Sequence, residues 1–342
     1  MSDKRKKNGT VPAGLFVFCV LSVLLCSLCA SGSLTLYFLC LVPAVAGQAA
    51  LLLLSLPTVL CALPVGFGVL LAGAVSRGLF AVLLVLLIAP AGYVLARCVR
   101  RGENRASAIS CLSAVMLTGT LLSLLLLLYT VARDAGSADM FAYLRGQLDA
   151  LADEMCDRMM QSYRTTAALY EKLGKSYEMP AEADVKTLVL RGMSVLPAIG
   201  LLSLFFLSLA TTYVLDLLAV ILRGRSLGRM AAYRVSPVYA GAFLCLLPAA
   251  VLWQDFSSPF YLSVLNGAIV LAPVLALGAV YALPRIFGWV RRLSRRPFDF
   301  VLFLALLVLF VLFYFAYVVL ISAIVYAVFI IKNALSHREK DS

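Results

Sequence analysis

Asp216 is the residue whose type and position most directly suggest chemistry. It stands in the apolar run "TTYVLDLLAVILRGR", residues 211–225, which ends in two arginines. A charged side chain inside a membrane segment costs roughly 2.5–3.5 kcal/mol on insertion scales, so it must face water, pair with a base or be protonated. Arg223 follows two helical turns later on the same face and offers partial compensation. Asp216 is thus either a structural polar group near a membrane surface or part of a polar binding site.

Three further polar side chains stand in long apolar runs. Tyr213 precedes Asp216 by about one helical turn, and Asn266 and Gln48 lie in two other runs. Amide side chains within a bilayer most often bridge helices, at about 0.6 kcal/mol each, and they can also line a substrate pocket. If the chain has a small-molecule site, we expect these four residues to line it.

Motifs of well-known enzyme classes are missing from the sequence. It contains no Walker A loop, no HExxH and no GxSxG, and its only histidine, His337, lies in the charged tail. Cys26 and Cys29 form a CxxC without a second pair or a histidine, so small apolar filler is the default role of the nine cysteines. A membrane enzyme would need a converging acid and base, which the sequence does not reveal. We therefore expect no enzyme activity, no catalytic residue, no metal site and no cofactor.

The elements that must position the polar residues are membrane helices. The chain is 63% hydrophobic and only 13% charged, whereas soluble domains are about half apolar and about one quarter charged. Lipid is the solvent that accommodates so much apolar surface. The net charge of +12 is spread over short clusters between apolar runs, which membrane topology explains better than nucleic-acid binding does.

Nine segments come close to the length of about 20 apolar residues that a membrane helix needs. They are 12–30, 34–55, 57–75, 79–97, 108–131, 195–222, 238–254, 261–283 and 299–331. The last run is longer than a bilayer requires and holds no proline or glycine, so we favour one tilted helix over a hairpin near Ser322. Eight or ten spans are the alternatives, and the C-terminus changes side between nine and ten.

The basic clusters predict the orientation. With alternating spans, "KRKK" at 4–7 and the clusters at 97–105, 223–234 and 285–296 all fall on one side. Cytoplasmic loops are enriched in Lys and Arg. We therefore expect a multi-pass protein of the cell membrane with a cytoplasmic N-terminus.

The segment 137–178 is the one sizeable hydrophilic region. Its apolar residues recur every three or four positions from Phe141 to Tyr170, which is typical of an amphipathic helix. We expect one or two extracytoplasmic helices here, acting as a connector or as a lid over an outward-facing cavity.

The fold class is all-α, a polytopic transmembrane helical bundle. It divides into N-terminal transmembrane helices at 1–131, an extracytoplasmic amphipathic insert at 132–190, C-terminal transmembrane helices at 191–335 and a polar tail at 336–342.

Three segments of the C-terminal half carry a family resemblance. "YRVSPVYAGAF" at 233–243 is similar to a WR-x-P motif that begins a span, and "VLNGAIVLAPVLALGAV" at 264–280 is similar to an LN…G span. The segment 197–225 resembles the preceding span in layout, with Tyr213 in place. These motifs resemble the YybS-like bacterial membrane proteins, a family of unknown function.

The resemblance implies a role in transport. The family has been grouped with the substrate-binding S-components of energy-coupling-factor vitamin transporters. The chain would then capture a small molecule in a bacterial membrane and work with a coupling subunit and paired ATPases. It would hold Asp216, Tyr213 and Asn266 at one cavity. The alternative is a non-catalytic scaffold or regulator that binds another membrane or envelope protein, which predicts a packed bundle with an exposed apolar or amphipathic face.

Overall fold

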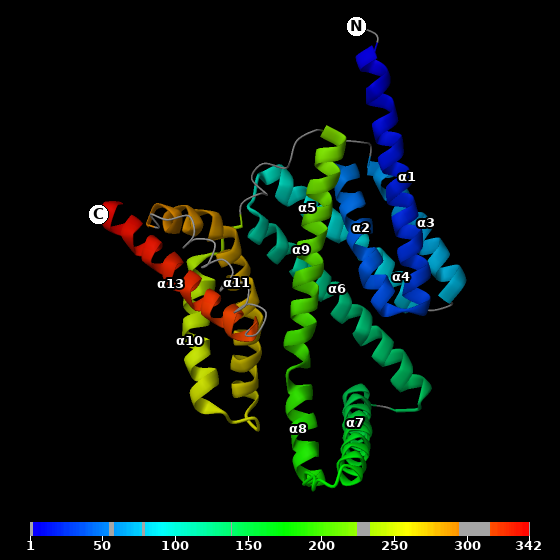
Figure 1. The fold of residues 1–342 in the computed structure, drawn as a ribbon. Helices are drawn as coiled ribbons and strands as arrows, with labels where there is room; N and C mark the ends of the chain where they lie inside the picture. The colour runs from blue at the N-terminus through cyan, green and yellow to red at the C-terminus, as the bar shows by residue number, and fades with distance from the viewer. Residues whose placement is uncertain are drawn as a thin grey trace.

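The structure is a computed structural model that describes residues 3–54, 58–76, 79–137, 139–223, 233–293 and 315–341. Every regular element within these ranges is an α-helix. The helices form an elongated bundle with a helical hairpin projecting from one end (Figure 1). The predicted all-α bundle is therefore confirmed.

The first five helices form one packed group. They are α1 (Asp3–Gly32), α2 (Leu34–Leu53), α3 (Thr58–Ser76), α4 (Leu79–Leu86) and α5 (Ile88–Arg101). α2 lies at the centre, in contact with α1, α5 and α9. Tyr37 and Leu41 on α2 are fully buried among small and branched side chains of the neighbouring helices, and the Tyr37 hydroxyl donates to the Leu84 carbonyl at 2.9 Å. The hydrogen bond satisfies a polar group that would otherwise be unpaired in a membrane interior.

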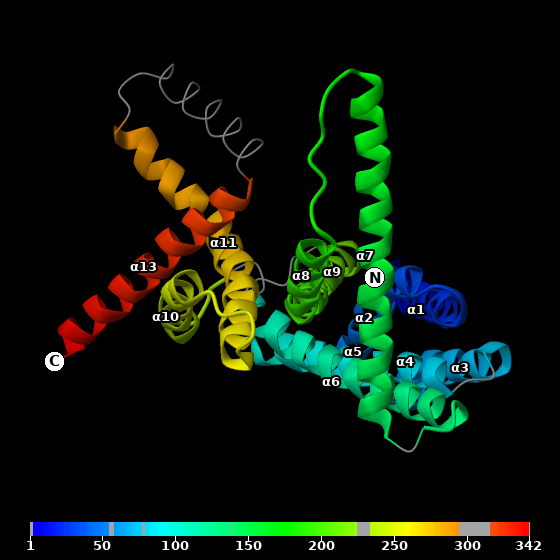
Figure 2. The ribbon, with the colours of Figure 1, turned by 90° about the horizontal axis from the view of Figure 1, so that it is seen from below.

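A second group contains the last described helices. They are α10 (Pro237–Trp253), α11 (Pro259–Leu293) and α13 (Phe315–Asp341). α11 contacts both of the others, and Figure 2 shows α13 crossing it at a steep angle. Phe243, Leu275 and Ala323 are fully buried where the three helices meet.

Two long helices join these groups. α6 (Arg105–Asp134) and α9 (Leu196–Arg223) pack against each other and contribute to both cores. Met116 and Leu215 belong to the first core, while Ile109 and Phe205 belong to the second. The junction of the two groups is therefore built from α6 and α9.

The amphipathic segment is helical, as the sequence predicts. α7 (Met140–Lys172) pairs with α8 (Glu182–Ser194) in the projecting hairpin (Figures 1 and 2), and α8 leads into α9 at Val195. Ala152 and Cys156 on α7 pack against Val185 and Val189 on α8. The hairpin thus has a small apolar core of its own.

The number of long spans is smaller than predicted. Among the described residues, seven helices are long and apolar enough to cross a membrane, whereas the sequence predicts nine. The two remaining predicted spans, 57–75 and 238–254, correspond to the apolar helices Val59–Val75 and Pro237–Trp253, which are shorter than those seven helices. A 17-residue helix rises only about 25 Å, less than the roughly 30 Å hydrocarbon core. The sequence leaves open whether 299–331 forms one span or two. Residues 299–314 of this segment lie outside the described residues.

Helix ends that carry basic clusters lie at the same end of the bundle. Figure 1 shows the N-terminal end of α1, the α5–α6 turn and the C-terminal ends of α9 and α11 at this end. The α7–α8 hairpin and the α10–α11 turn lie at the opposite end. We call the first of these the basic end. Its assignment to the cytoplasm remains a prediction from the charge pattern.

Candidate ligand-binding site

A buried arginine lies at the junction of α6 and α9. Arg105 is the first residue of α6, directly after Asn104, whose side chain caps the helix by accepting the Ser107 N–H at 3.0 Å. The Arg105 residue is only 3% exposed. Its Nη2 donates to Asp216 Oδ2 at 3.2 Å, which pairs the acid of α9 with a base on another helix. A buried charge is tolerated when it is paired in this way.

Two tyrosines also contact the guanidinium of Arg105. Arg105 Nη1 donates to the Tyr281 hydroxyl at 2.9 Å, and the guanidinium carbon lies 4.2 Å from the centre of the Tyr213 ring. The Tyr213 and Tyr281 hydroxyls share a hydrogen bond. A guanidinium over a tyrosine face is attracted by the ring quadrupole. Arg105, Asp216, Tyr213 and Tyr281 thus connect α6, α9 and α11, and we call them the arginine network.

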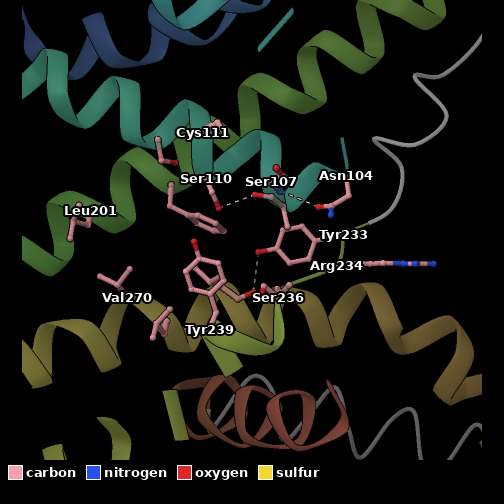
Figure 3. A pocket seen from close by; sticks show the side chains of 16 residues that line it. Asn104, Ser107, Ser110, Cys111, Leu201, Tyr233, Arg234, Ser236, Tyr239 and Val270 are labelled. Carbon is pink, nitrogen blue, oxygen red and sulfur yellow. Dashed lines mark hydrogen bonds between the residues drawn. The ribbon is translucent and has the colours of Figure 1, made fainter. Parts of the chain in front are cut away.

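A cavity of about 580 Å³ lies beside this network. It is bounded by α6, α9, α11, the start of α10 and the residues that lead into α10 (Figure 3). Ser107, Ser110 and Ser113 line the α6 wall at helical spacing, while Leu271 and Val274 contribute apolar surface from α11. Its volume falls within the roughly 300–1,000 Å³ of small-molecule pockets.

Tyr233 connects the cavity with the arginine network. Its side chain lines the cavity, its ring stacks on Tyr281 at 5.2 Å between centroids, and its hydroxyl donates to the Val274 carbonyl at 3.0 Å. Arg105 itself does not line the cavity, although the next residue, Ala106, does. The network therefore supports one wall of the cavity from behind.

The rim of the cavity has polar groups from the start of α10. The Ser236 side chain caps α10 by accepting the Val238 N–H at 3.4 Å, and Pro237 occupies the first turn. Tyr239 lines the cavity and is half-exposed, whereas the Arg234 side chain extends away from it (Figure 3). One wall with hydroxyl groups and another with apolar groups suit an amphipathic molecule.

The structure brings together two of the four residues that the sequence singles out. Asp216 and Tyr213 both contact Arg105. Asn266 lies on α11, where Nδ2 donates to the Ser194 carbonyl at 3.0 Å and Oδ1 accepts the Ala198 N–H at 3.1 Å. That arrangement joins α11 to the start of α9 and satisfies backbone groups at a helix junction.

Gln48 lies in the first helical group, apart from the other three. It is 3% exposed on α2, and its Nε2 donates to the Cys61 carbonyl at 2.7 Å. Its Oε1 accepts a weak bond from the Cys19 thiol at 3.6 Å. Gln48 therefore bridges α1, α2 and α3. The sequence-based expectation of one convergent set does not match this geometry.

Sequence reasoning missed Arg105, Tyr281 and the serine wall. In the sequence, Arg105 is one of several basic residues between two apolar segments. Nothing in the sequence distinguishes a buried arginine at the start of a helix from an exposed one. The spacing of Ser107, Ser110 and Ser113 was the available signal, since it places three hydroxyl groups along one side of a helix.

No protein-family model, curated protein or solved structure matches the chain. Its class therefore follows from its own fold: a multi-pass α-helical membrane protein. Large apolar side chains such as Leu70, Ile221 and Leu252 are exposed on its helices, as expected where lipid covers them.

Proposed function

We propose that the protein binds a small amphipathic molecule in the cavity between α6, α9, α10 and α11, as the substrate-binding part of a membrane transport system. The observation that carries the proposal is the cavity of about 580 Å³ with a serine wall facing apolar side chains. A packed bundle without such a cavity would have favoured a scaffold.

The hydroxyl groups indicate the chemistry of the ligand's polar end. Ser107 Oγ donates to Glu103 Oε2 at 2.6 Å, and Ser110 Oγ donates to the Ala106 carbonyl at 2.9 Å. A hydroxyl has one proton to donate, and its lone pairs can still accept. The polar end of the ligand should therefore carry O–H or N–H donors, with an apolar body against Phe205 and Leu271.

The partner is part of the same proposal. The resemblance to YybS-like proteins supports a bacterial S-component-like role, in which a coupling subunit and paired ATPases supply the energy. The basic end of the bundle is where cytoplasmic partners would meet it if the charge pattern sets the orientation. The role proposed for this chain is binding, without catalysis.

The test is mass spectrometry of small molecules and proteins that copurify with the full chain in mild detergent. Ser110→Phe places a bulky side chain in the cavity and obstructs it, and Ser203→Phe is the matched control. Ser203 is also an exposed serine of an apolar helix that donates to the carbonyl four residues earlier, at 2.8 Å, but it does not line the cavity. We expect a bound amphiphile in the wild type and in Ser203→Phe, and its loss in Ser110→Phe. Equal ligand content in all three would overturn the proposal.

A second candidate function rests on the α7–α8 hairpin. α7 exposes Phe141, Leu148 and Leu169, each at least two-fifths exposed, on a helix outside the apolar bundle. Such a surface fits a scaffold that binds another envelope protein. In the same experiment, Leu148→Asp would remove a copurifying protein while leaving any bound small molecule, which separates this function from the first.

A further inference from the structure

Two thiols and a carboxylate converge at the α5–α6 turn. Cys98 lies on the last turns of α5, Glu103 in the turn and Cys111 on α6, and their possible ligand atoms all lie within 4.8 Å of one another. Cys98 is buried, Glu103 is half-buried and Cys111 is exposed. These residues lie outside the arginine network.

The local backbone explains why they meet. Gly102 ends α5 in the left-handed conformation, with φ of 66°, and its N–H donates to the Val99 carbonyl at 3.0 Å. The Glu103 N–H then donates to the Cys98 carbonyl at 3.1 Å, so that the chain folds back over the end of α5. Asn104 starts α6 at once. This tight turn sets Cys111 of α6 beside Cys98 of α5.

A neighbouring hydroxyl fixes the carboxylate. Ser107 Oγ donates to Glu103 Oε2 at 2.6 Å. A carboxylate has about four lone-pair sites, so Glu103 can accept this hydrogen bond and still ligate a cation. Ligating carboxylates are commonly oriented by a hydrogen bond of this kind, and such outer partners contribute to metal affinity.

The donor set selects the type of metal. Soft thiolates favour zinc or other thiophilic metals over magnesium and calcium, which prefer oxygen ligands. The basic residues Arg100 and Arg101 close to the turn would oppose a cation held by weak oxygen ligands. Two thiolates and a carboxylate around zinc instead give a net negative charge, which these guanidinium groups offset.

We propose that Cys98, Glu103 and Cys111 bind a zinc ion with one coordination position left open. Binding replaces the two thiol protons, which are released, and changes no oxidation state. Three protein ligands and one open position are the arrangement of zinc sites that take a water or a substrate atom. Cys111 and Ser107 also line the cavity, so the proposed zinc site borders it. This inference departs from the sequence-based expectation of no metal, and it stands whether or not the cavity holds an amphiphile.

The test is metal binding by the reduced full chain in detergent, with Zn²⁺ for stoichiometry and Co²⁺ as a spectroscopic probe. We expect one zinc ion per chain and a thiolate-to-cobalt charge-transfer band. Cys98→Ser and Cys111→Ser should abolish the band, and Cys245→Ser, the control at another exposed cysteine, should keep it. Ser107→Ala should weaken zinc binding about 10- to 100-fold.

Several results would overturn the site. These are a cobalt spectrum without the thiolate band, an unchanged band in Cys111→Ser, or a Cys98–Cys111 disulfide that persists in the purified chain after reduction. Because Cys111 is exposed, we expect Cys111→Ser to fold, and its elution on gel filtration should match that of Cys245→Ser. If a monodisperse Cys111→Ser protein lacks the charge-transfer band, the cause is the missing Cys111 thiolate and not a loss of folded structure.

Discussion

Arg105 and Asp216 are 111 residues apart in the chain, yet Arg105 Nη2 lies 3.2 Å from Asp216 Oδ2. The pair joins the first residue of α6 to the C-terminal half of α9. The arginine side chain is 4% exposed and the aspartate side chain 20%. The charge of Asp216 on α9 is therefore balanced by a base from another helix.

Asp216→Asn should strongly destabilise the protein, because it leaves the Arg105 charge buried without its counter-ion. Removing one partner of a buried pair costs about 3–5 kcal/mol. Apparent melting temperature in detergent is the measurement. The double variant Arg105→Met, Asp216→Leu should recover most of the loss, since an apolar replacement of both charges removes the unpaired group. A double variant as unstable as Asp216→Asn would show that the pair is not the cause.

Tyr281→Phe should cost about 1.5–3 kcal/mol, because the hydroxyl accepts a hydrogen bond from a charged guanidinium. Tyr261→Phe is the matched control. Its hydroxyl donates to the neutral Ala250 carbonyl at 3.2 Å, a contact that contributes about 0.5–1.5 kcal/mol. Melting of both variants under the same conditions should give the larger decrease for Tyr281→Phe, and the reverse order would contradict the charged network.

Gly278→Ala should destabilise the packing of α11 against α13. A Cβ at this position would lie 2.1 Å from Cε1 of Tyr326 on α13, so side chains or backbone must shift. Overpacking of this kind costs about 1–3 kcal/mol. Gly200→Ala on α9 has no neighbouring atom within 4 Å and should be neutral or slightly stabilising, because alanine favours a helix. Equal melting of the two variants would mean that α11 and α13 do not pack in this way.

Asn266→Ala should lower stability without changing ligand content. Its amide bridges α11 and the start of α9, and such membrane hydrogen bonds contribute about 0.6 kcal/mol on average. Melting and copurified small molecules are measured on the same preparation. If Asn266→Ala instead lost the small molecule at unchanged stability, Asn266 would be a ligand-binding residue.

The positions of the helices could be predicted largely from the sequence, because lipid imposes long apolar segments. The site could not. Asp216 is visible as a costly residue, but its partner Arg105 is contributed by another helix, and only the packing of α6 on α9 decides which base it meets. Gln48 and Asn266 have the same polarity as a ligand-binding residue, yet both satisfy backbone groups between helices. In the sequence, Cys98 and Cys111 look like small apolar residues of two helices. The turn at Gly102 places them side by side, which the sequence does not show.

The central claim is a membrane-spanning bundle whose basic end, with the cavity and the arginine network near it, faces the cytoplasm. Its most direct test is labelling of introduced cysteines in intact cells by a membrane-impermeant thiol reagent, measured above the signal of the parent chain. Ser137→Cys and Ser257→Cys lie in turns at one end of the bundle, and Arg101→Cys and Arg234→Cys lie near the basic end. We predict labelling of the first two in intact cells and of all four after permeabilisation. Labelling of Arg101→Cys in intact cells, or of only one of Ser137→Cys and Ser257→Cys, would contradict the account.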